Sequence, residues 1–313
     1  MNRNRFLRKA AIAAVVLIMS CNRDKEASDG TIVELRLVSG VEVSTRAAFP
    51  DSDTKIPNGE EVNVYVDEAG GAVQLYPKTI LIANGANALS GPRMNFPANG
   101  NNVDIYALHT NATVSTAFPT DLLTHTVRAD QRSLADYASS DLLYAKKTNV
   151  ARTASPVLLT FNHLLSKLQV AIMAGEGLTD RDITGIIIGG TRPQAQFTLT
   201  KEIASNAVAI TPAGAASSIT IGADVSVNLT SNITFNDAII VPQTLRSGTE
   251  FITVQLSGGT NLVYRLPEDT NFEKGKKYGY LITAKSNSLE LVLITEIEDW
   301  VSGGNTPIDI TME

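Results

Sequence analysis

The single cysteine of the chain, Cys21, is the residue whose position most clearly predicts a chemical modification. It follows four basic residues and an apolar run, residues 10–19, and the small residue Ser20 stands directly before it. A basic start and a short apolar run are the pattern of a signal peptide, and this run is too short to span a bilayer as a helix. The motif Ile18-Met-Ser-Cys21 fits the lipobox of exported lipoproteins. We therefore expect cleavage before Cys21 and lipid on its thiol.

Lipid on Cys21 would hold the mature protein on a membrane. Two or three acyl chains on one residue give stable anchoring, whereas a single chain gives only marginal binding. The alternative is an ordinary secretory signal in which Cys21 has no role. The polar residues 22–26 that follow would form a charged tether. A chain whose one cysteine is modified has no disulfide and no thiolate ligand, so its stability must come from packing.

The three histidines, His109, His125 and His163, are the other side chains that could bind a metal or transfer protons. None belongs to a His-x-x-x-His pair, and no second cysteine exists to complete a site. His163 lies in an apolar segment, residues 159–165, and we interpret it as a core or interface histidine with a backbone partner. The sequence also has no Gly-x-Ser-x-Gly elbow and no glycine-rich phosphate loop. It therefore predicts no catalytic residue, no metal and no cofactor.

One polar loop contains the remaining candidates for chemistry. Ser52 and Lys55 have the spacing of a Ser-x-x-Lys motif, but its companion motifs are missing, so we attribute the match to chance. Asp51, Asp53 and residues 60–61 bring carboxylates close together in the sequence, and a calcium site is one interpretation. Lys55 stands where an EF-hand would need a ligand, which favours a solvated acidic loop instead.

The composition argues against two classes of partner. The net charge is −6 and no cluster of lysine and arginine forms a basic stripe, so nucleic acid is not an expected partner. Aromatic residues make up 6% of the chain with one tryptophan, which disfavours a glycan site built on aromatic platforms. The hydrophobic content is 43%, and the chain after Cys21 is long enough for two domains with cores of their own.

Apolar and polar residues alternate along most of the chain. The first example is a run of five residues: Val33, Glu34, Leu35, Arg36 and Leu37. A period of two predicts a strand with one buried and one wet face, and the pattern recurs in short segments separated by Gly, Pro and Asn turns. Only residues 130–143 favour a short helix. We predict an all-β protein of two β-sandwich domains in tandem, with at most one or two short helices.

Two features suggest how the chain is divided. Residues 158–173 have the pattern of a long strand that is interrupted near His163. A polar stretch at residues 150–157 precedes this strand, and we place the domain boundary there. The predicted parts are a signal peptide at 1–20, a tether with the first strand at 21–46, and β-sandwiches at 47–155 and 156–313.

Four stretches of the sequence occur in an order that is shared with a known family. They are Ser44-Thr-Arg46-Ala, Asp141-Leu-Leu-Tyr-Ala145 leading to Leu159-Thr-Phe-Asn-His163-Leu-Leu-Ser-Lys167, Val241-Pro-Gln243, and Phe272-Glu-Lys-Gly-Lys-Lys-Tyr278 leading to Glu298-Asp-Trp300. With these stretches and the lipobox, the chain resembles the fimbrillin family of Bacteroidales, the major and accessory subunits of their fimbriae.

The resemblance implies transthyretin-like sandwiches and assembly by donor-strand exchange. In that family a protease cuts after an arginine beyond the first strand, and an extended segment of another subunit fills the groove left behind. Arg46 matches that arginine, and residues 31–38 match the strand that would leave. An incoming strand would satisfy the exposed backbone and replace the side chains of Val33, Leu35 and Leu37.

The sequence leaves several alternatives open. A permanent first strand with an uncut Arg46 is one of them. The family's donor segment is C-terminal, and both residues 289–293 and residues 308–312 are apolar enough to serve. Trp300 is interpreted as a core residue rather than a platform for a ligand.

The leading interpretation is a fimbrial subunit or a fimbria-associated adhesin on the outer membrane surface, with other fimbrial subunits as its partners. One alternative is a monomeric surface lipoprotein that binds a glycan or a host protein. Another is a fimbrial anchor subunit that keeps the lipid on Cys21. A hydrolase is disfavoured because the sequence offers no nucleophile and base that can be named as a pair.

Overall fold

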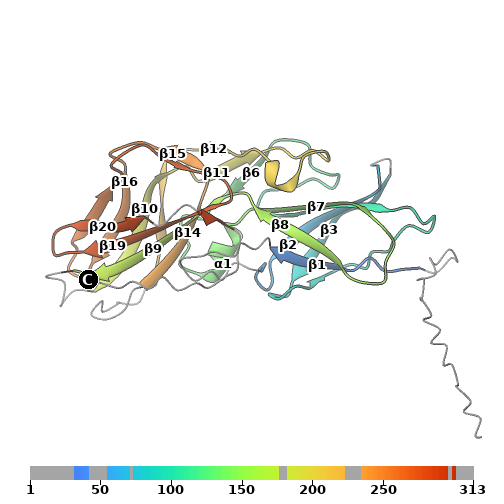
Figure 1. Cartoon of the computed structure of the whole chain (residues 1–313), viewed down its shortest axis with the longest axis horizontal. Helices are drawn as coiled ribbons and strands as arrows, with labels where there is room; N and C mark the ends of the chain where they lie inside the picture. Colours follow the sequence, from blue (N-terminus) through green and yellow to red (C-terminus); the bar gives the residue numbers. More distant parts are fainter. Residues whose placement is uncertain are drawn as a thin grey trace, which may run out of the picture. The chain divides into compact units, whose positions relative to one another are not determined.

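The computed structural model describes residues 32–41, 55–70, 73–175, 182–222, 234–294 and 298–300. These residues all belong to one unit that begins at Ile32, and residues 1–31 lie outside them. Nearly all of the regular structure is β-strand (Figure 1). Among the described residues the helices are α1 (Leu134–Ser139) and the short 3-10 helix η1 (Ser205–Ala207). The all-β prediction, with at most one or two short helices, is therefore confirmed.

Seven strands form the first sheet, in the order β1-β8-β7-β5-β2-β3-β4. Their bounds are β1 Leu37–Val41, β2 Glu61–Glu68, β3 Gln74–Ala83, β4 Leu89–Ser90, β5 Val103–His109, β7 Leu143–Val150 and β8 Val157–His163. Along β2, Val62, Val64 and Val66 pack into one apolar core, whereas Tyr65 packs into a second core on the opposite face. Alternate side chains of β2 therefore pack into two different cores, because both faces of the strand are covered.

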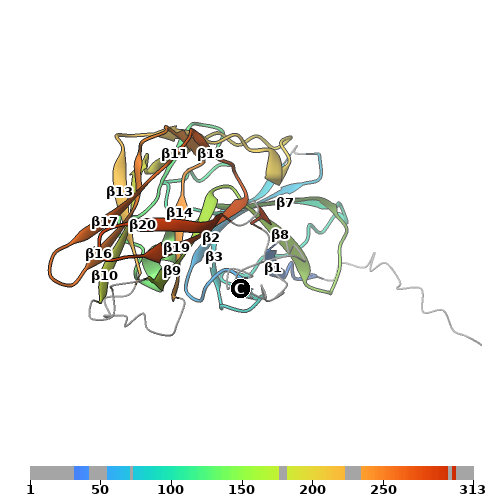
Figure 2. The same cartoon turned by 60° about the vertical axis from the view of Figure 1, so that its left-hand side comes forward.

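Most strands after β8 form a β-sandwich (Figure 2). One of its sheets has the order β13-β10-β16-β17, and the other has the order β14-β9-β19-β20 with β21 paired to β19. The bounds are β9 Ser166–Ala174, β10 Ile183–Thr191, β13 Ser217–Ile221, β14 Thr234–Ile240, β16 Glu250–Leu256, β17 Asn261–Arg265, β19 Lys276–Ala284, β20 Leu289–Ile294 and β21 Glu298–Asp299.

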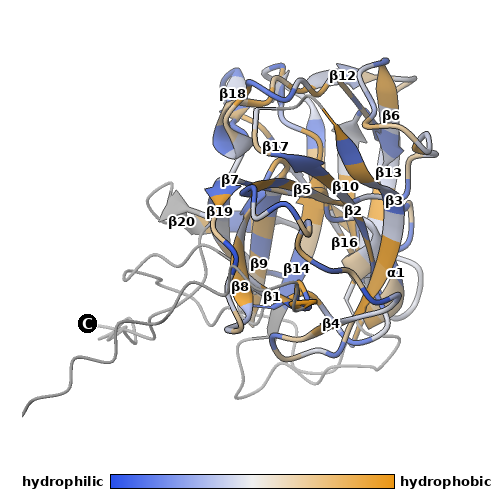
Figure 3. Ribbon diagram, turned by 90° about the vertical axis from the view of Figure 1, so that its right-hand side faces the viewer, coloured by the Kyte–Doolittle hydropathy of each residue, from blue (hydrophilic) through white to orange (hydrophobic). Residues whose placement is uncertain are grey.

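The core of this sandwich follows from alternate residues on facing strands. Leu168, Val170 and Ile172 of β9 belong to the same buried cluster as Ile186 and Ile188 of β10. Figure 3 shows that apolar residues are concentrated on the strands, while the connecting loops are mostly hydrophilic. Burial of such side chains is the main source of stability in a chain without disulfides.

Two small sheets complete the fold. One has the order β12-β11-β6, and the other pairs β15 with β18. The bounds are β6 Leu123–Thr126, β11 Gln194–Phe197, β12 Thr211–Ala213, β15 Gln243–Leu245 and β18 Thr270–Phe272. Strand β6 precedes β7 in the chain but pairs with β11, through Ala195 and His125. Within the described part of the chain, no helix has both the length and the apolar character needed to cross a membrane.

The long apolar stretch at residues 158–173 consists of two strands. Strand β8 ends at His163 and β9 begins at Ser166, so the predicted break is confirmed. The predicted domain boundary at residues 155/156 falls between β7 and β8, which pair within the first sheet through Leu143 and His163. How the chain divides into independently folding domains stays a prediction.

Helix α1 lies within residues 130–143, the segment for which the sequence predicts a short helix. The hydroxyl of Ser133 accepts a hydrogen bond of 3.1 Å from the backbone N–H of Asp136, which caps the helix N-terminus.

The residues just before this cap, 129–131, lie between two edge strands of the sandwich. We call them the closing segment, because the backbone of Gln131 and Ala129 bonds to Thr220 of β13, and the Gln131 side chain bonds to β14.

Candidate functional site

The candidate site is the place in the first sheet that holds residues 33–41. Strand β1 runs parallel to β8, with Leu37 opposite Val157 and Val41 opposite Phe161. The N–H of Val157 donates a hydrogen bond of 2.8 Å to the carbonyl oxygen of Arg36. One side of β1 is thereby joined to an edge strand of the sheet.

The other side of the same segment pairs with residues 87–96, around β4. The N–H of Leu35 donates to the Met94 carbonyl at 2.9 Å, and the N–H of Ser39 donates to the Asn87 carbonyl at 2.7 Å. Val38 also forms an antiparallel bridge to Ala88. We call the space between β8 and residues 87–96 the first-strand slot. Its occupant connects the two edges of the sheet, so removing it would leave unpaired backbone on both.

The side chains of residues 33–39 alternate between the core and the surface. Leu35 and Leu37 are 3% and 4% exposed and belong to the apolar core of the first sheet. Ser39 is 4% exposed, and Val33 is half-buried against the same core. The buried face predicted for Val33, Leu35 and Leu37 is present. That these residues form a removable strand stays a prediction.

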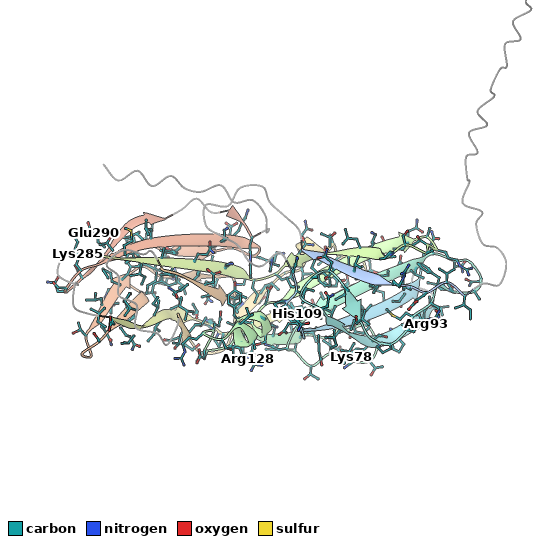
Figure 4. The ribbon with its side chains drawn as sticks, turned by 90° about the horizontal axis from the view of Figure 1, so that it is seen from below. Lys78, Arg93, His109, Arg128, Lys285 and Glu290 are labelled. Atoms are coloured by element: carbon teal, nitrogen blue, oxygen red, sulfur yellow. The ribbon has the colours of Figure 1, made fainter. Side chains whose placement is uncertain are left out.

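Outward-facing side chains add little to the docking of this segment. Glu34 lies 4.0 Å from Arg93 (labelled in Figure 4), and both side chains are largely exposed. Arg36 donates a hydrogen bond to the carbonyl oxygen of Ala154. An exposed ion pair stabilises by roughly 0–1 kcal/mol, whereas burying one leucine stabilises by about 1.5–3 kcal/mol. Leu35 and Leu37 therefore dominate the docking.

A second feature lies just beyond the end of this slot. The imidazole of His163, at the end of β8, stacks on the indole of Trp300 with ring centroids 3.8 Å apart and planes 11° apart. Its Nδ1 lies 2.9 Å from a carboxylate oxygen of Asp141. The backbone N–H of Trp300 donates to the Gly275 carbonyl at 2.6 Å. These contacts attach the described C-terminal end of the chain to the end of β8.

The structure corrects one detail of the sequence interpretation. His163 is buried as expected, but its partner is the Asp141 carboxylate rather than a backbone group. Its Nε2 has no hydrogen-bond partner among the described residues, and the Trp300 ring covers one face of the imidazole. The pair of Asp141 and His163 therefore has a structural role. Trp300 is buried in the core, in agreement with the sequence interpretation.

Residues 45–300 match the fimbrillin-like family. The chain belongs to the fimbrillin-like family. Its fold is similar to that of a Bacteroides uniformis protein assigned to cell adhesion, with a TM-score of 0.61 at 18% identity over 86% of this chain and 98% of that one. No curated protein matches the sequence.

Two other solved structures share the fold. A Bacteroides ovatus protein assigned to cell adhesion has a TM-score of 0.59 at 18% identity, covering 88% of this chain and 99% of that one. The tip fimbrial protein Mfa3 of Porphyromonas gingivalis, solved with a C-terminal truncation, has a TM-score of 0.51 at 9% identity, covering 85% and 100%. At these identities the likeness shows the fold alone, and the fimbrillin resemblance seen in the sequence is confirmed by the family match.

Some predicted residues of this fimbrillin-like chain lie outside the described residues. They are Cys21, Thr31, Arg46, Asp51, Ser52, Asp53 and the segment 301–313. The lipidation, cleavage and donor predictions on them therefore stay predictions. Across the described ranges, no group of three or more His, Cys, Asp or Glu residues is placed to hold a metal ion.

The other two histidines have structural partners. Nδ1 of His125 lies 3.0 Å from the hydroxyl of Thr110, and its Nε2 lies 3.0 Å from the carbonyl oxygen of Ser140. Burial lowers the pKa of His125 to about 4, because the charged form would lose its hydration. The nitrogens of His109 lie 2.9 Å and 3.2 Å from the carbonyl oxygens of Glu61 and Ala138. Both histidines thus connect strands to the region of α1.

Proposed function

We propose that this fimbrillin-like protein is a subunit of a surface fimbria, or an adhesin attached to one, and that it assembles by exchanging its first strand. The observation that supports this most is the two-sided docking of residues 33–39. Both edges of the slot bond to the backbone of this one terminal segment, and Leu35 and Leu37 fill the core beneath it. Another extended strand with the same alternation could make the same kinds of contact.

Cleavage after Arg46 would change what holds the first strand. Before the cut, residues 32–41 are covalently joined to the rest of the chain; after it, only hydrogen bonds and apolar contacts hold them. The proposed lipid on Cys21 lies on the same side of the cut as this strand. One cleavage would therefore separate the subunit from its membrane anchor at the outer membrane and open its slot at the same time.

The donor segment that we propose is the C-terminal end, residues 308–313. Its apolar residues alternate as in the first strand: Ile308, Ile310 and Met312 correspond to Val33, Leu35 and Leu37. Polar residues occupy the positions between them in both segments. A segment with this pattern can bury one face in the slot of another subunit and expose the other face to water.

The competing donor candidate, residues 289–293, has a role within its own subunit. Leu289 and Leu291 lie on β20, which pairs with β19 and packs against the sandwich core. An ion pair between Lys285 and Glu290, labelled in Figure 4, joins the two arms of this hairpin. Releasing β20 would break these contacts, and this favours residues 308–313 as the donor.

The experiment that tests the proposal uses residues 22–313 and an arginine-specific protease. We expect a new N-terminus at Ala47, a core that stays folded, and a ladder of oligomers on an unboiled gel. The matched control is Arg46→Ala, which should keep its first strand and remain monomeric under the same digestion. If the cut chain unfolds without assembling, or Arg46 resists the protease, the first strand is permanent. An anchor subunit or a monomeric surface lipoprotein would then describe the protein better.

A further inference from the structure

We propose that Asn84 is a site of spontaneous deamidation, and that its modification loosens one wall of the first-strand slot. An asparagine that precedes a glycine is prone to this reaction, because glycine has no Cβ to hinder the approach of its backbone nitrogen to the asparagine amide. The sequence contains three such dipeptides, Asn58-Gly59, Asn84-Gly85 and Asn99-Gly100. All three asparagines are exposed, but their hydrogen bonds differ.

The reaction involves only the chain and water. The backbone nitrogen of Gly85 forms a bond to Cγ of Asn84, the bond from Cγ to Nδ2 breaks, and ammonia leaves with the proton of the attacking nitrogen. The product is a five-membered succinimide ring. Water then opens the ring, at Cγ to give aspartate or at the main-chain carbonyl carbon to give isoaspartate. The first step is favoured because both groups belong to adjacent residues of one chain.

The Gly85 N–H is available for this attack. Among the described residues, none accepts a hydrogen bond from it. In contrast, the Gly59 N–H donates to the carbonyl oxygen of Ala83 at 2.9 Å. The Gly100 N–H donates to the carbonyl oxygen of Pro97 at 3.3 Å. A bonded N–H must first lose its hydrogen bond, which should slow the attack by about two- to tenfold.

The side-chain amide of Asn84 is held in a way that favours attack at its Cγ. Its Oδ1 accepts hydrogen bonds from the backbone N–H groups of Ala86 at 2.9 Å and Ala88 at 3.0 Å. As the nitrogen adds to Cγ, negative charge develops on Oδ1, and N–H donors bond a charged oxygen more strongly than a neutral one. The two N–H groups therefore act like an oxyanion hole.

The amides of the other two asparagines lack this arrangement. Oδ1 of Asn99 accepts one hydrogen bond, from the Asn101 N–H at 3.0 Å, and its Nδ2 donates to Oε1 of Glu68 at 2.8 Å. The Asn99 nitrogen must leave this carboxylate before it can depart as ammonia. No group in the described part of the chain donates a hydrogen bond to Oδ1 of Asn58. We therefore expect Asn84 to react first.

The turn that Asn84 stabilises belongs to one wall of the first-strand slot. Ala88 forms a bridge with Val38, and the Asn87 carbonyl oxygen accepts a hydrogen bond from the Ser39 N–H at 2.7 Å. Isoaspartate adds one carbon to the main chain at position 84, so the two bonds that hold the N–H groups of residues 86 and 88 cannot both persist. The pairing of residues 87–88 with residues 38–39 should weaken as a result.

The weakening should be confined to one end of this wall. The Leu35 N–H donates to the Met94 carbonyl oxygen at 2.9 Å, and Met94 lies outside the turn that begins at Asn84. We expect the Ser39 amide hydrogen to exchange with solvent about tenfold faster in the isoaspartate form, because local opening controls exchange. Exchange at Leu35 should be unchanged, which makes it an internal control.

The test follows all three asparagines in the intact chain, with the first strand in place. The chain is incubated at mildly alkaline pH, since the attacking nitrogen must lose its proton, and peptide mass spectrometry measures conversion of each amide to a carboxyl group. An isoaspartate-specific methyltransferase identifies the rearranged product. We expect Asn84 to react about fivefold faster than Asn58 or Asn99. In urea the three rates should become similar, because the folded contacts that distinguish them are lost.

A control variant separates the reaction from other effects of incubation. Asn84→Gln keeps an exposed amide, but its attack would require a six-membered ring, so it should stay unmodified and keep slow exchange at Ser39. Equal rates at the three asparagines in the folded chain would overturn the assignment of Asn84. Modification of Asn84 with unchanged Ser39 exchange would overturn its effect on the slot. Neither result depends on strand exchange, which the ladder after the Arg46 cut tests separately.

Discussion

The first sheet and the sandwich that follows it both have edges to protect, and they protect them in different ways. In the first sheet, residues 33–41 fill the first-strand slot and bond to both of its edges. In the sandwich, the closing segment at residues 129–131 lies between edge strands β13 and β14. Its Gln131 amide donates to the Ile239 carbonyl at 2.9 Å and accepts from the Ile239 N–H at 2.8 Å.

The difference lies in how each filling segment is connected. Residues 33–41 come from the N-terminal side of the chain, and one cut would make them a separate peptide. The closing segment is internal, and it is held between β6 and the capped helix α1. Exposed edges invite pairing with other chains, so both gaps must be filled. We infer that only the first gap is built to change its occupant.

Placing a charge in the first-strand core should have the largest effect. Leu35→Asp would bury a carboxylate without a partner, and we expect the first strand to undock with a loss of about 3–5 kcal/mol in docking free energy. The full-length chain should then form oligomers on an unboiled gel without any cut after Arg46. Glu34→Gln is the control, because Glu34 is exposed and should leave the chain monomeric. A Leu35→Asp chain that stays monomeric and protease-resistant contradicts the exchange of this strand.

The second largest effect is expected from acid, through the protonation of His125. Burial lowers the pKa of His125 on β6 to about 4. Between pH 6.5 and pH 4 the unfolded state therefore binds a proton at His125 that the folded state does not bind. The stability from neutral His125 is present above pH 6.5 and is lost as pH falls toward 4, by up to about 3 kcal/mol.

The measurement for His125 is urea unfolding from pH 7 to pH 4. His125→Asn serves as the reference, since other groups titrate in the same range and only the difference between the two curves belongs to His125. Parallel curves would show that His125 does not sense acid.

Removing the Gln131 amide, which lies between β13 and β14, should lower the free energy of unfolding by a smaller amount. Gln131→Ala removes both hydrogen bonds to Ile239, whose side chain is buried, and we expect a loss of about 2 kcal/mol in the free energy of unfolding. Gln131→Glu keeps an acceptor for the Ile239 N–H but places a buried carboxylate beside the Ile239 carbonyl oxygen, so it should cost more than Gln131→Ala. Oligomer formation after the Arg46 cut should be unchanged in both. A Gln131→Ala chain that oligomerises without the cut would show that the second gap also exchanges strands.

The smallest effect is expected at the turn that holds Trp300. Gly275 has φ of 67°, and an added Cβ would lie 3.3 Å from the His163 carbonyl oxygen. Gly275→Ala should cost about 1 kcal/mol and loosen the indole stack. Because Trp300 is the one tryptophan, its fluorescence reports this change directly. Gly258→Ala is the matched control, since its φ is also positive at 86° but its added Cβ would meet nothing within 4 Å. Equal emission spectra for the two variants would count against the anchoring role of Gly275.

The sequence predicts the local features of this fold well. Alternation of Val33, Leu35 and Leu37 indicates a strand with one buried face, and the break at His163 follows from the same kind of pattern. Periodicity is a property of neighbouring residues, so it can be read from the chain without knowing what each strand pairs with.

Contacts between distant residues could not be predicted in this way. Nothing near Leu37 in the sequence indicates a parallel partner at Val157, and nothing near Gln131 indicates that its amide meets Ile239. The His163–Trp300 stack combines two residues that were each interpreted alone. The sequence feature that could have indicated this contact is the one tryptophan, which follows an apolar segment and whose large side chain needs a buried site.

The parallel pairing of β1 with β8 has a consequence for the order of folding. Leu37 and its partner Val157 are about 120 positions apart, so this contact closes a very long loop. Because synthesis starts at the N-terminus, the first strand is made well before the residues that form its pairing edge. We expect it to dock last, after the rest of the first sheet has assembled. The newly made chain would thus pass through an interval in which its slot is empty and its own strand, still covalently joined, is the nearest one available to fill it.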